Sequence, residues 1–273
     1  MIRQGLLVDI DSIPDGAVLV DTRLALTGPT GRERYDAGHI PGAAYVDVDD
    51  DLAAPPGAGG RHPLPDRSVF VAAIRRAGVR RGSTVVAYDD GPGTAAARVW
   101  WLLRHYGHAD VLVLDGGLAA WTAAGRPVST EAADPEPGDW DGSPGRLPVV
   151  EADDVAALAD DGVVIDVRAA TRYRGEHEPI DPVAGHVPGA VNMPLTGNTD
   201  EIGRFLTDDE LRRGFEAHGV RDGVPVAAYC GSGVTATQTL LALRLAGFAD
   251  AALYAGSWSA WITDPSRPIA TAG

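Results

Sequence analysis

Short apolar runs bounded by turn-forming residues alternate along this chain with longer segments of helical periodicity. The runs Val18–Asp21, Val85–Tyr88 and Val111–Leu114 are rich in aliphatic and β-branched residues, which is typical of buried strands. Residues 66–77 and 94–106 place apolar side chains at helical spacing. Because strands that alternate with helices pair in parallel and are covered on both faces, the pattern predicts an α/β fold.

The pattern of the first half of the chain returns in the second half. Asp-x-Arg occurs at 21–23 and again at 166–168, each time after an apolar run. The motif Gly-His-(Ile/Val)-Pro-Gly-Ala follows at 38–43 and again at 185–190. Further matches keep the same order, which indicates a tandem repeat of one structural unit.

The repeats set the expected domain boundaries. Residues 129–148 are rich in Pro, Gly, Asp and Ser, a composition typical of a linker. We therefore expect two domains, at 1–128 and 149–273, each with a parallel sheet flanked by helices on both faces. Both lengths fall in the usual range for a domain with its own core.

Charge narrows the classes of function. The 273 residues include 23 basic ones, all of them Arg, against 38 acidic ones, for a formal net charge of −15. A surface of this charge repels nucleic acid and anionic membranes, so neither is expected as a partner. The absence of Lys excludes a lysine Schiff base and a Walker-A phosphate loop.

The single cysteine, Cys230, excludes an intrachain disulfide and is consistent with a reducing compartment. Residues 1–12 lack a secretory signal pattern, and no apolar run approaches the roughly 18 residues that span a membrane. We therefore expect a cytoplasmic protein. The seven His and the one Cys do not have the spacing of zinc ligands, so neither a metal nor another cofactor is expected.

The candidate chemistry is concentrated where a predicted strand at 226–229 meets a predicted helix at 235–246. Backbone N–H groups of a tight loop there, together with the helix N-terminus, stabilise an anion at the loop's centre. A thiolate at that point is a nucleophile, and a lone buried cysteine without such a loop would be inert. The sequence thus predicts Cys230 as the nucleophile within a loop formed by Gly231, Ser232, Gly233, Val234 and Thr235.

These motifs together resemble the tandem-domain rhodanese family, which comprises thiosulfate and 3-mercaptopyruvate sulfurtransferases. The resemblance covers nearly the whole chain. In that family the second domain carries the catalytic cysteine and the first is catalytically silent. Here Tyr88 is followed by Asp89 where Tyr229 is followed by Cys230. The resemblance implies that Cys230 takes sulfur from a small donor as a persulfide. It then passes the sulfur to cyanide, a small thiol or the thiol of a protein.

The resemblance also implies a substrate-binding arginine after the second Asp-x-Arg. Arg172 occupies the matching position, and Arg174 is the second choice. A guanidinium suits the carboxylate of mercaptopyruvate and the sulfonate of thiosulfate equally, because it binds such groups with two hydrogen bonds. Some mercaptopyruvate enzymes have another arginine further along, but residues 178–182 contain none. The loop after Cys230 is neutral, as in mercaptopyruvate enzymes, so the two features leave the donor open.

Two histidines occupy equivalent positions in the repeats, His39 and His186. Duplication in a silent domain favours a structural role for both. The family resemblance places the histidine of the first domain near the cleft in mercaptopyruvate enzymes, so His39 is also a candidate proton relay. Ser232 and Thr235 are candidates to hydrogen-bond the sulfur or to relay protons.

Two other functions compete with sulfur transfer. A cysteine-dependent phosphatase or arsenate reductase needs an arginine at the end of the loop to bind a tetrahedral dianion, and Ala236 occupies that place. A module that carries or senses sulfur without turnover would share the first step with an enzyme. Turnover of a small donor distinguishes the enzyme from the carrier.

Overall fold

The computed structural model describes residues 1–272, which divide into two compact units. The first unit comprises Met1–Ala54, Leu64–Arg146 and Asp200–Phe205, and the second comprises Pro55–Pro63, Leu147–Thr199 and the chain from Leu206 onward. The tandem arrangement is therefore present, with two short segments exchanged between the units.

The segment predicted as a linker is mostly part of the first unit. Trp140 is buried, and its backbone N–H donates to the carbonyl of Val79 at 3.2 Å. The N–H of Gly138 donates to the carbonyl of Arg75 at 2.8 Å. These contacts attach the Pro- and Gly-rich stretch to the surface of the first unit. Its composition therefore reflects an irregular, packed segment and not a flexible linker.

The first unit is a six-stranded sheet with helices around it. Its strands run in the order β1-β2-β6-β5-β3-β4, all parallel except β1, which pairs with β2 in the antiparallel direction. The predicted strands and helices are confirmed within one residue at each end. The elements are β1 Ile2–Arg3, β2 Leu7–Val8, β3 Val18–Asp21, α1 Gly31–Ala37, β4 Ala44–Tyr45, α2 Arg67–Arg76, β5 Val85–Tyr88, α3 Thr94–His105, β6 Val111–Leu114 and α4 Gly117–Ala123.

The second unit repeats the central part of this topology. Its four parallel strands have the order β10-β9-β7-β8, which corresponds to β6-β5-β3-β4 of the first unit. The elements are α5 Ala152–Asp161, β7 Val163–Asp166, α6 Ala170–Tyr173, β8 Val191–Asn192, the 3-10 helix η1 Leu195–Asn198, α7 Asp208–Ala217, β9 Val226–Tyr229, α8 Ala236–Leu245, β10 Ala252–Leu253 and α9 Ser257–Trp261.

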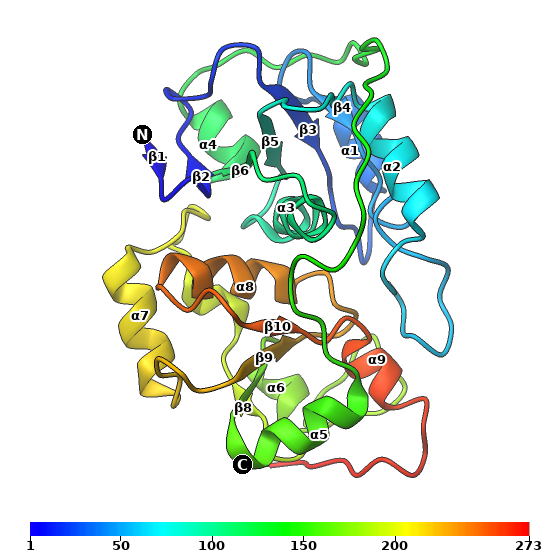
Figure 1. The fold of residues 1–273 in the computed structure, drawn as a ribbon, viewed down its shortest axis with the longest axis vertical. Helices are drawn as coiled ribbons and strands as arrows, with labels where there is room; N and C mark the ends of the chain where they lie inside the picture. Colours follow the sequence, from blue (N-terminus) through cyan, green and yellow to red (C-terminus); the bar gives the residue numbers. More distant parts are fainter. Residues whose placement is uncertain (273) are drawn as a thin grey trace. The chain divides into compact units, whose positions relative to one another are not determined.

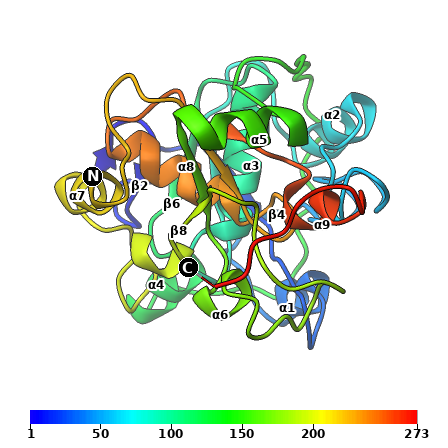
Figure 2. The same cartoon turned by 90° about the horizontal axis from the view of Figure 1, so that it is seen from below.

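Helices cover both faces of the second sheet, as the sequence predicts. Figure 1 shows α7 and α8 on one face and α5 and α6 on the other, and Figure 2 views this unit from the side of α5 and α6. The core under α5 and α9 is built from Val155, Val164, Tyr229, Trp258 and Trp261. Central parallel strands buried on both faces read as continuous apolar runs, which explains why β9 has no polar residue.

The repeated Asp-x-Arg motifs form buried ion pairs that hold the following loop in both units. Arg23 donates to Asp21 and to the carbonyl of Gly38, and Arg168 makes the corresponding bonds to Asp166 and to the carbonyl of Gly185. A guanidinium that reaches a carboxylate and a carbonyl together fixes the geometry of both.

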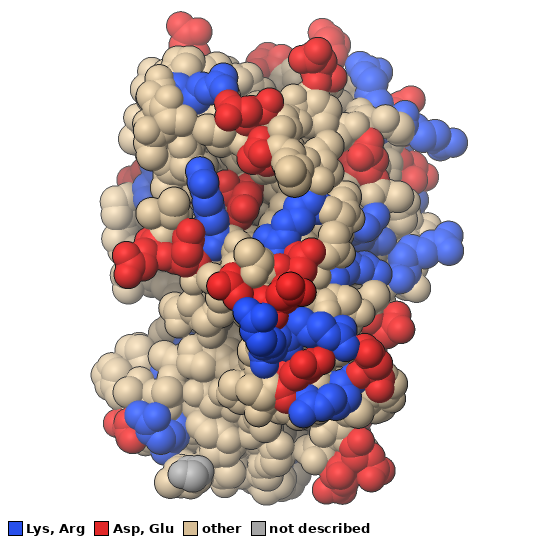
Figure 3. Space-filling model, turned by 90° about the vertical axis from the view of Figure 1, so that its left-hand side faces the viewer, with Lys and Arg blue, Asp and Glu red and all other residues tan. Residues whose placement is uncertain are grey.

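Acidic and basic side chains are interspersed on the face of the molecule seen in Figure 3, where no wide basic patch is present. Within residues 1–272 no helix is long and apolar enough to cross a membrane. The same residues contain no group of three or more His, Cys, Asp or Glu side chains placed to hold a metal ion. The absence of nucleic-acid and membrane partners stays a prediction.

Candidate active site

Cys230 lies at the carboxyl end of β9, at the entrance to the loop that leads into α8. Its side chain is buried, and its Sγ atom accepts hydrogen bonds from the backbone N–H of Gly233 at 3.0 Å and of Ser232 at 3.4 Å. Ligands of parallel α/β sheets bind at the carboxyl ends of the strands. The predicted loop is therefore curled around the predicted nucleophile, in an arrangement that stabilises a thiolate.

The curvature of the loop requires a glycine at position 233. Gly233 has a φ of 83°, a left-handed conformation that other residues adopt at a cost. A Cβ atom at this position would also collide with the carbonyl oxygen of Ala255. Val234 is buried, and Thr235 is the half-buried N-cap residue of α8. The loop is thus tight enough to direct its N–H groups inward.

The start of α9 supports the loop from the other side. The Oγ of Ser257 accepts the N–H of Cys230 at 3.1 Å and lies 4.0 Å from its Sγ. The N–H groups of Trp258 and Ser259 donate to the carbonyls of Cys230 and Gly231 at 3.0 and 2.9 Å. Ser257 has a φ of 54°, whereas the first unit has Gly117 at the corresponding position with a φ of 52°. The second unit therefore tolerates strain that places a hydroxyl beside the cysteine.

We expect Ser257→Ala to lower the free energy of unfolding more than Ser257→Gly, by about 1 kcal/mol. Alanine keeps the left-handed strain that glycine relieves, and such strain costs roughly 1–2 kcal/mol per residue. Both variants remove the acceptor of the Cys230 N–H, so both should transfer sulfur more slowly. Urea denaturation and steady-state rates of the two variants provide the measurement. Equal stabilities would contradict the assignment of strain.

A histidine contacts the loop, but it is not the one singled out in the sequence. The Nδ1 of His62 lies 2.7 Å from the Oγ of Ser232, and both residues are buried. His39 is fully buried in the first unit, where its ring nitrogens face the carbonyls of Tyr35 at 2.9 Å and Glu131 at 3.0 Å. The geometry of His39 fits the structural role, and that of His62 fits the proton relay.

The equivalent histidine of the second unit repeats the structural arrangement. The Nδ1 of His186 lies 2.7 Å from the carbonyl of Tyr173, and its ring stacks on the Tyr173 ring at 3.6 Å. In the first unit His39 stacks on Tyr35 at 3.8 Å. The duplication seen in the sequence therefore corresponds to a duplicated packing contact.

The predicted substrate arginine, Arg172, belongs to the four-residue helix α6 and points toward the loop. A Cβ atom at Gly231 would lie 3.4 Å from its Nη2. Its guanidinium donates to Glu178 through Nε at 2.9 Å and to Asp181 through Nη2 at 2.9 Å. The second choice, Arg174, is exposed and pairs with Glu176. The geometry thus favours Arg172 over Arg174 as the residue that meets a donor.

A segment from the first half of the chain also contacts the loop, which no pattern in the sequence predicted. Residues 55–63 pack within the second unit. The backbone N–H of Arg61 donates to the Oγ of Ser259 at 3.0 Å, and the Arg61 side chain forms an ion pair with Asp181. The one available signal was the polar pair Arg61-His62 within a stretch of Gly and Pro.

The corresponding loop of the first unit surrounds an acidic side chain of its own. Asp89 follows β5 as Cys230 follows β9, and its buried carboxylate accepts four backbone N–H groups at 2.9–3.2 Å. The donors are Gly91, Gly93, Ala95 and Ala96. Burial raises the pKa of Asp89, while the four N–H groups oppose that rise and favour the charged form. A loop of this architecture therefore directs a cluster of N–H groups at an acidic group in its centre.

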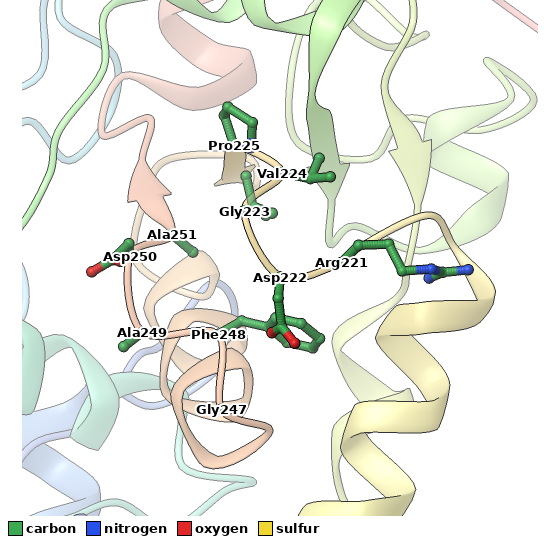
Figure 4. A pocket seen from close by; sticks show the side chains of 11 residues that line it. Arg221, Asp222, Gly223, Val224, Pro225, Gly247, Phe248, Ala249, Asp250 and Ala251 are labelled. Atoms are coloured by element: carbon green, nitrogen blue, oxygen red, sulfur yellow. The ribbon is translucent and has the colours of Figure 1, made fainter.

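A hollow near β9 lies away from this chemistry. A space of about 390 Å³ is lined by residues 221–226 and 247–251, at the amino end of the strand. Figure 4 shows Asp222 and Phe248 among the residues that line it, while the side chain of Arg221 points away. Its distance from the carboxyl end of β9 argues against a role in the reaction of Cys230.

Comparison with known proteins agrees with this geometry. The model of the rhodanese-like domain matches the chain twice, at residues 9–124 and 151–264. The chain belongs to the rhodanese-like family. The two copies include strands β3 to β6 and strands β7 to β10, so the predicted fold is confirmed.

Relatives of this rhodanese-like chain are named as sulfurtransferases. It is 50% identical over 269 residues to a probable 3-mercaptopyruvate sulfurtransferase of Pseudomonas aeruginosa, covering 95% of this chain and 94% of that protein. It is 40% identical over 262 residues to a putative thiosulfate sulfurtransferase of Mycobacterium tuberculosis, covering 93% and 91%. The structure of the 3-mercaptopyruvate sulfurtransferase SseA from Escherichia coli superposes with a TM-score of 0.80 at 32% identity, covering 93% and 98%. The predicted sulfurtransferase activity is thereby confirmed.

Proposed function

We propose that this sulfurtransferase takes sulfur from 3-mercaptopyruvate onto Cys230 and passes it to a thiol or to cyanide. The Cys230 thiolate attacks the donor's sulfur, an S–S bond forms and the C–S bond breaks. The electron pair of that bond leaves with the carbon as the enolate of pyruvate, which then takes up a proton. The acceptor attacks the outer sulfur of the persulfide and restores the thiolate.

The observation that carries the proposal is the pair of N–H groups directed at the Sγ of Cys230. The same loop in the first unit binds a carboxylate with four N–H groups, which supports an anion-binding role for this architecture. Such fixed donors stabilise the thiolate and the charge that develops on the persulfide.

The choice of donor is supported by four features. The loop after Cys230 has no charged residue, and two guanidiniums lie next to Gly231. The Ser232 hydroxyl beside His62 provides a path for the proton that the enolate requires. Thiosulfate would release sulfite, which requires no such proton. The relative from Pseudomonas aeruginosa is named for mercaptopyruvate.

The test combines mass spectrometry with kinetics. The protein treated with 3-mercaptopyruvate alone should gain the mass of one sulfur atom and lose it on adding cyanide or dithiothreitol. Its kcat/KM should be higher with 3-mercaptopyruvate than with thiosulfate when the acceptor is the same. A preference for thiosulfate would overturn the donor, and a protein that gains sulfur without turning over would be a carrier.

We expect Arg172→Ala to lower kcat/KM for the donor about ten- to a hundredfold. This is the loss that corresponds to hydrogen bonds to a charged group, which contribute roughly 1.5–3 kcal/mol. Discharge of a preformed persulfide to cyanide should change far less, because the donor has already left. Arg172→Lys should recover part of the loss, since an ammonium does not form the two-pronged contact. Arg174→Ala should leave both half-reactions unchanged, and a larger effect of Arg174→Ala would reverse the order of the two candidates.

A further inference from the structure

Two guanidiniums converge on the residue that follows the nucleophile. A Cβ atom at Gly231 would lie 2.7 Å from the Nη2 of Arg61 and 3.4 Å from the Nη2 of Arg172. Arg172 comes from α6, whereas Arg61 comes from the segment 55–63, more than a hundred residues earlier in the chain. Glycine at 231 leaves the space into which both groups point.

The two cations are held together by shared carboxylates. Asp181 pairs with both Arg61 and Arg172, and Glu178 pairs with Arg172 and Arg168. Both carboxylates are almost fully buried, with side chains 3% and 4% exposed. Like charges placed this close repel each other, so the arrangement needs these counter-charges to persist without a bound anion.

The side chain of Arg61 is itself partly withdrawn from water. It is 27% exposed, and burial, opposed by the charge of Cys230, lowers the pKa of its guanidinium. A cation in such a place is stabilised by an incoming anion more strongly than an exposed one, because water screens the attraction less. Its position beside Gly231 places that attraction next to the nucleophile.

We propose that Arg61 is a second donor-binding residue, which together with Arg172 clamps the carboxylate end of a 2-oxo acid donor over Gly231. The inference rests on the proposed function. The stretch 178–182 contains no arginine and contributes Asp181 instead. Asp181 forms an ion pair with Arg61, which comes from another part of the chain. The site therefore has two guanidiniums facing the loop, Arg172 from α6 and Arg61 from the segment 55–63.

The first test measures the electrostatic potential at Cys230 without turnover. Iodoacetate and iodoacetamide alkylate the same thiolate, so the ratio of their rates reports the local attraction for an anion and not the thiolate fraction. Arg61→Met should lower this ratio roughly tenfold, as expected when a contact to a charged group is lost. Arg213→Met removes one charge from the exposed surface of α7 and should leave the ratio unchanged.

The second test uses the donor. Arg61→Met should raise KM for 3-mercaptopyruvate about tenfold or more while discharge of a preformed persulfide to dithiothreitol stays near the wild-type rate. Arg61→Lys should keep most of the reagent preference and recover only part of the donor affinity. Gly231→Ala adds a methyl group between the two guanidiniums and should weaken donor binding without removing a charge.

The outcomes distinguish the role of Arg61 from the proposed function of the protein. An alkylation ratio that is the same in wild type and Arg61→Met overturns the role of Arg61, as does an unchanged KM. If the wild-type protein transfers no sulfur from 3-mercaptopyruvate or thiosulfate, the proposed function fails, and the alkylation ratio still decides whether Arg61 attracts an anion to Cys230. Equal losses in the donor and discharge steps would indicate a displaced loop and would also reject the clamp.

Discussion

Replacing Cys230 by serine should abolish sulfur transfer and leave the fold intact. The hydroxyl occupies nearly the same volume as the thiol and can accept the N–H groups of Ser232 and Gly233 that now reach Sγ. A serine hydroxyl is a weak nucleophile at neutral pH unless an adjacent base activates it. We expect turnover to fall by on the order of 10⁴-fold or more, as when other enzymes lose their nucleophile.

The measurement is turnover with 3-mercaptopyruvate, alongside the mass of the protein after exposure to donor alone. Cys230→Ser should acquire no sulfur, while its urea midpoint should stay close to that of the wild type. Because the chain has one cysteine, no other thiol can replace it. Substantial turnover by the folded variant would reject Cys230 as the site of transfer.

Much of the fold could be predicted because its signals are local and occur twice. The apolar runs at β3, β5 and β6 are short and continuous, as central parallel strands require, and the second unit repeats them. The short strands at the sheet edges were missed. β1 has only two residues and pairs with β2 in the antiparallel direction, a feature too brief to produce a periodic pattern.

The site was predictable where the chain is continuous and not where it is assembled from distant parts. Cys230 and the loop after it follow from one strand-loop-helix segment. Arg61 and His62 meet that loop only because residues 55–63 pack within the second unit, and no periodicity in the sequence encodes that exchange. His39 became a relay candidate through the family resemblance, whereas its duplication favoured a structural role, since duplication marks what the two units share. The residues that distinguish the reactive unit are by nature not duplicated.

Strain offers a second example of what sequence could not reveal. The alignment of the repeats sets Ser257 opposite Gly117, which looks like an ordinary substitution of one small residue by another. The backbone shows that both adopt a left-handed φ, and that serine does so at a cost. The reason for this strain is visible only in the structure, where the Oγ of Ser257 accepts a hydrogen bond from the N–H of Cys230.

We expect His62→Gln to lower kcat with 3-mercaptopyruvate by about a hundredfold, the lower end of the range for general acid–base catalysis. Glutamine can still hydrogen-bond the Oγ of Ser232, but it cannot donate and recover a proton at neutral pH. The enolate of pyruvate must be protonated after the C–S bond breaks, and His62 acting through Ser232 is the group placed to supply that proton.

Thiosulfate provides the matched comparison, because sulfite leaves without needing a proton. The same His62→Gln variant should therefore keep most of its kcat with thiosulfate, and the ratio of the two kcat values should fall by nearly the full hundredfold. His39→Gln, in the first unit, should reduce stability and leave that ratio unchanged, since the His39 ring is engaged with the carbonyls of Tyr35 and Glu131. Equal losses with both donors would show that His62 only positions the loop. A ratio that shifts with His39→Gln would assign the relay to His39, the histidine that the family resemblance suggests.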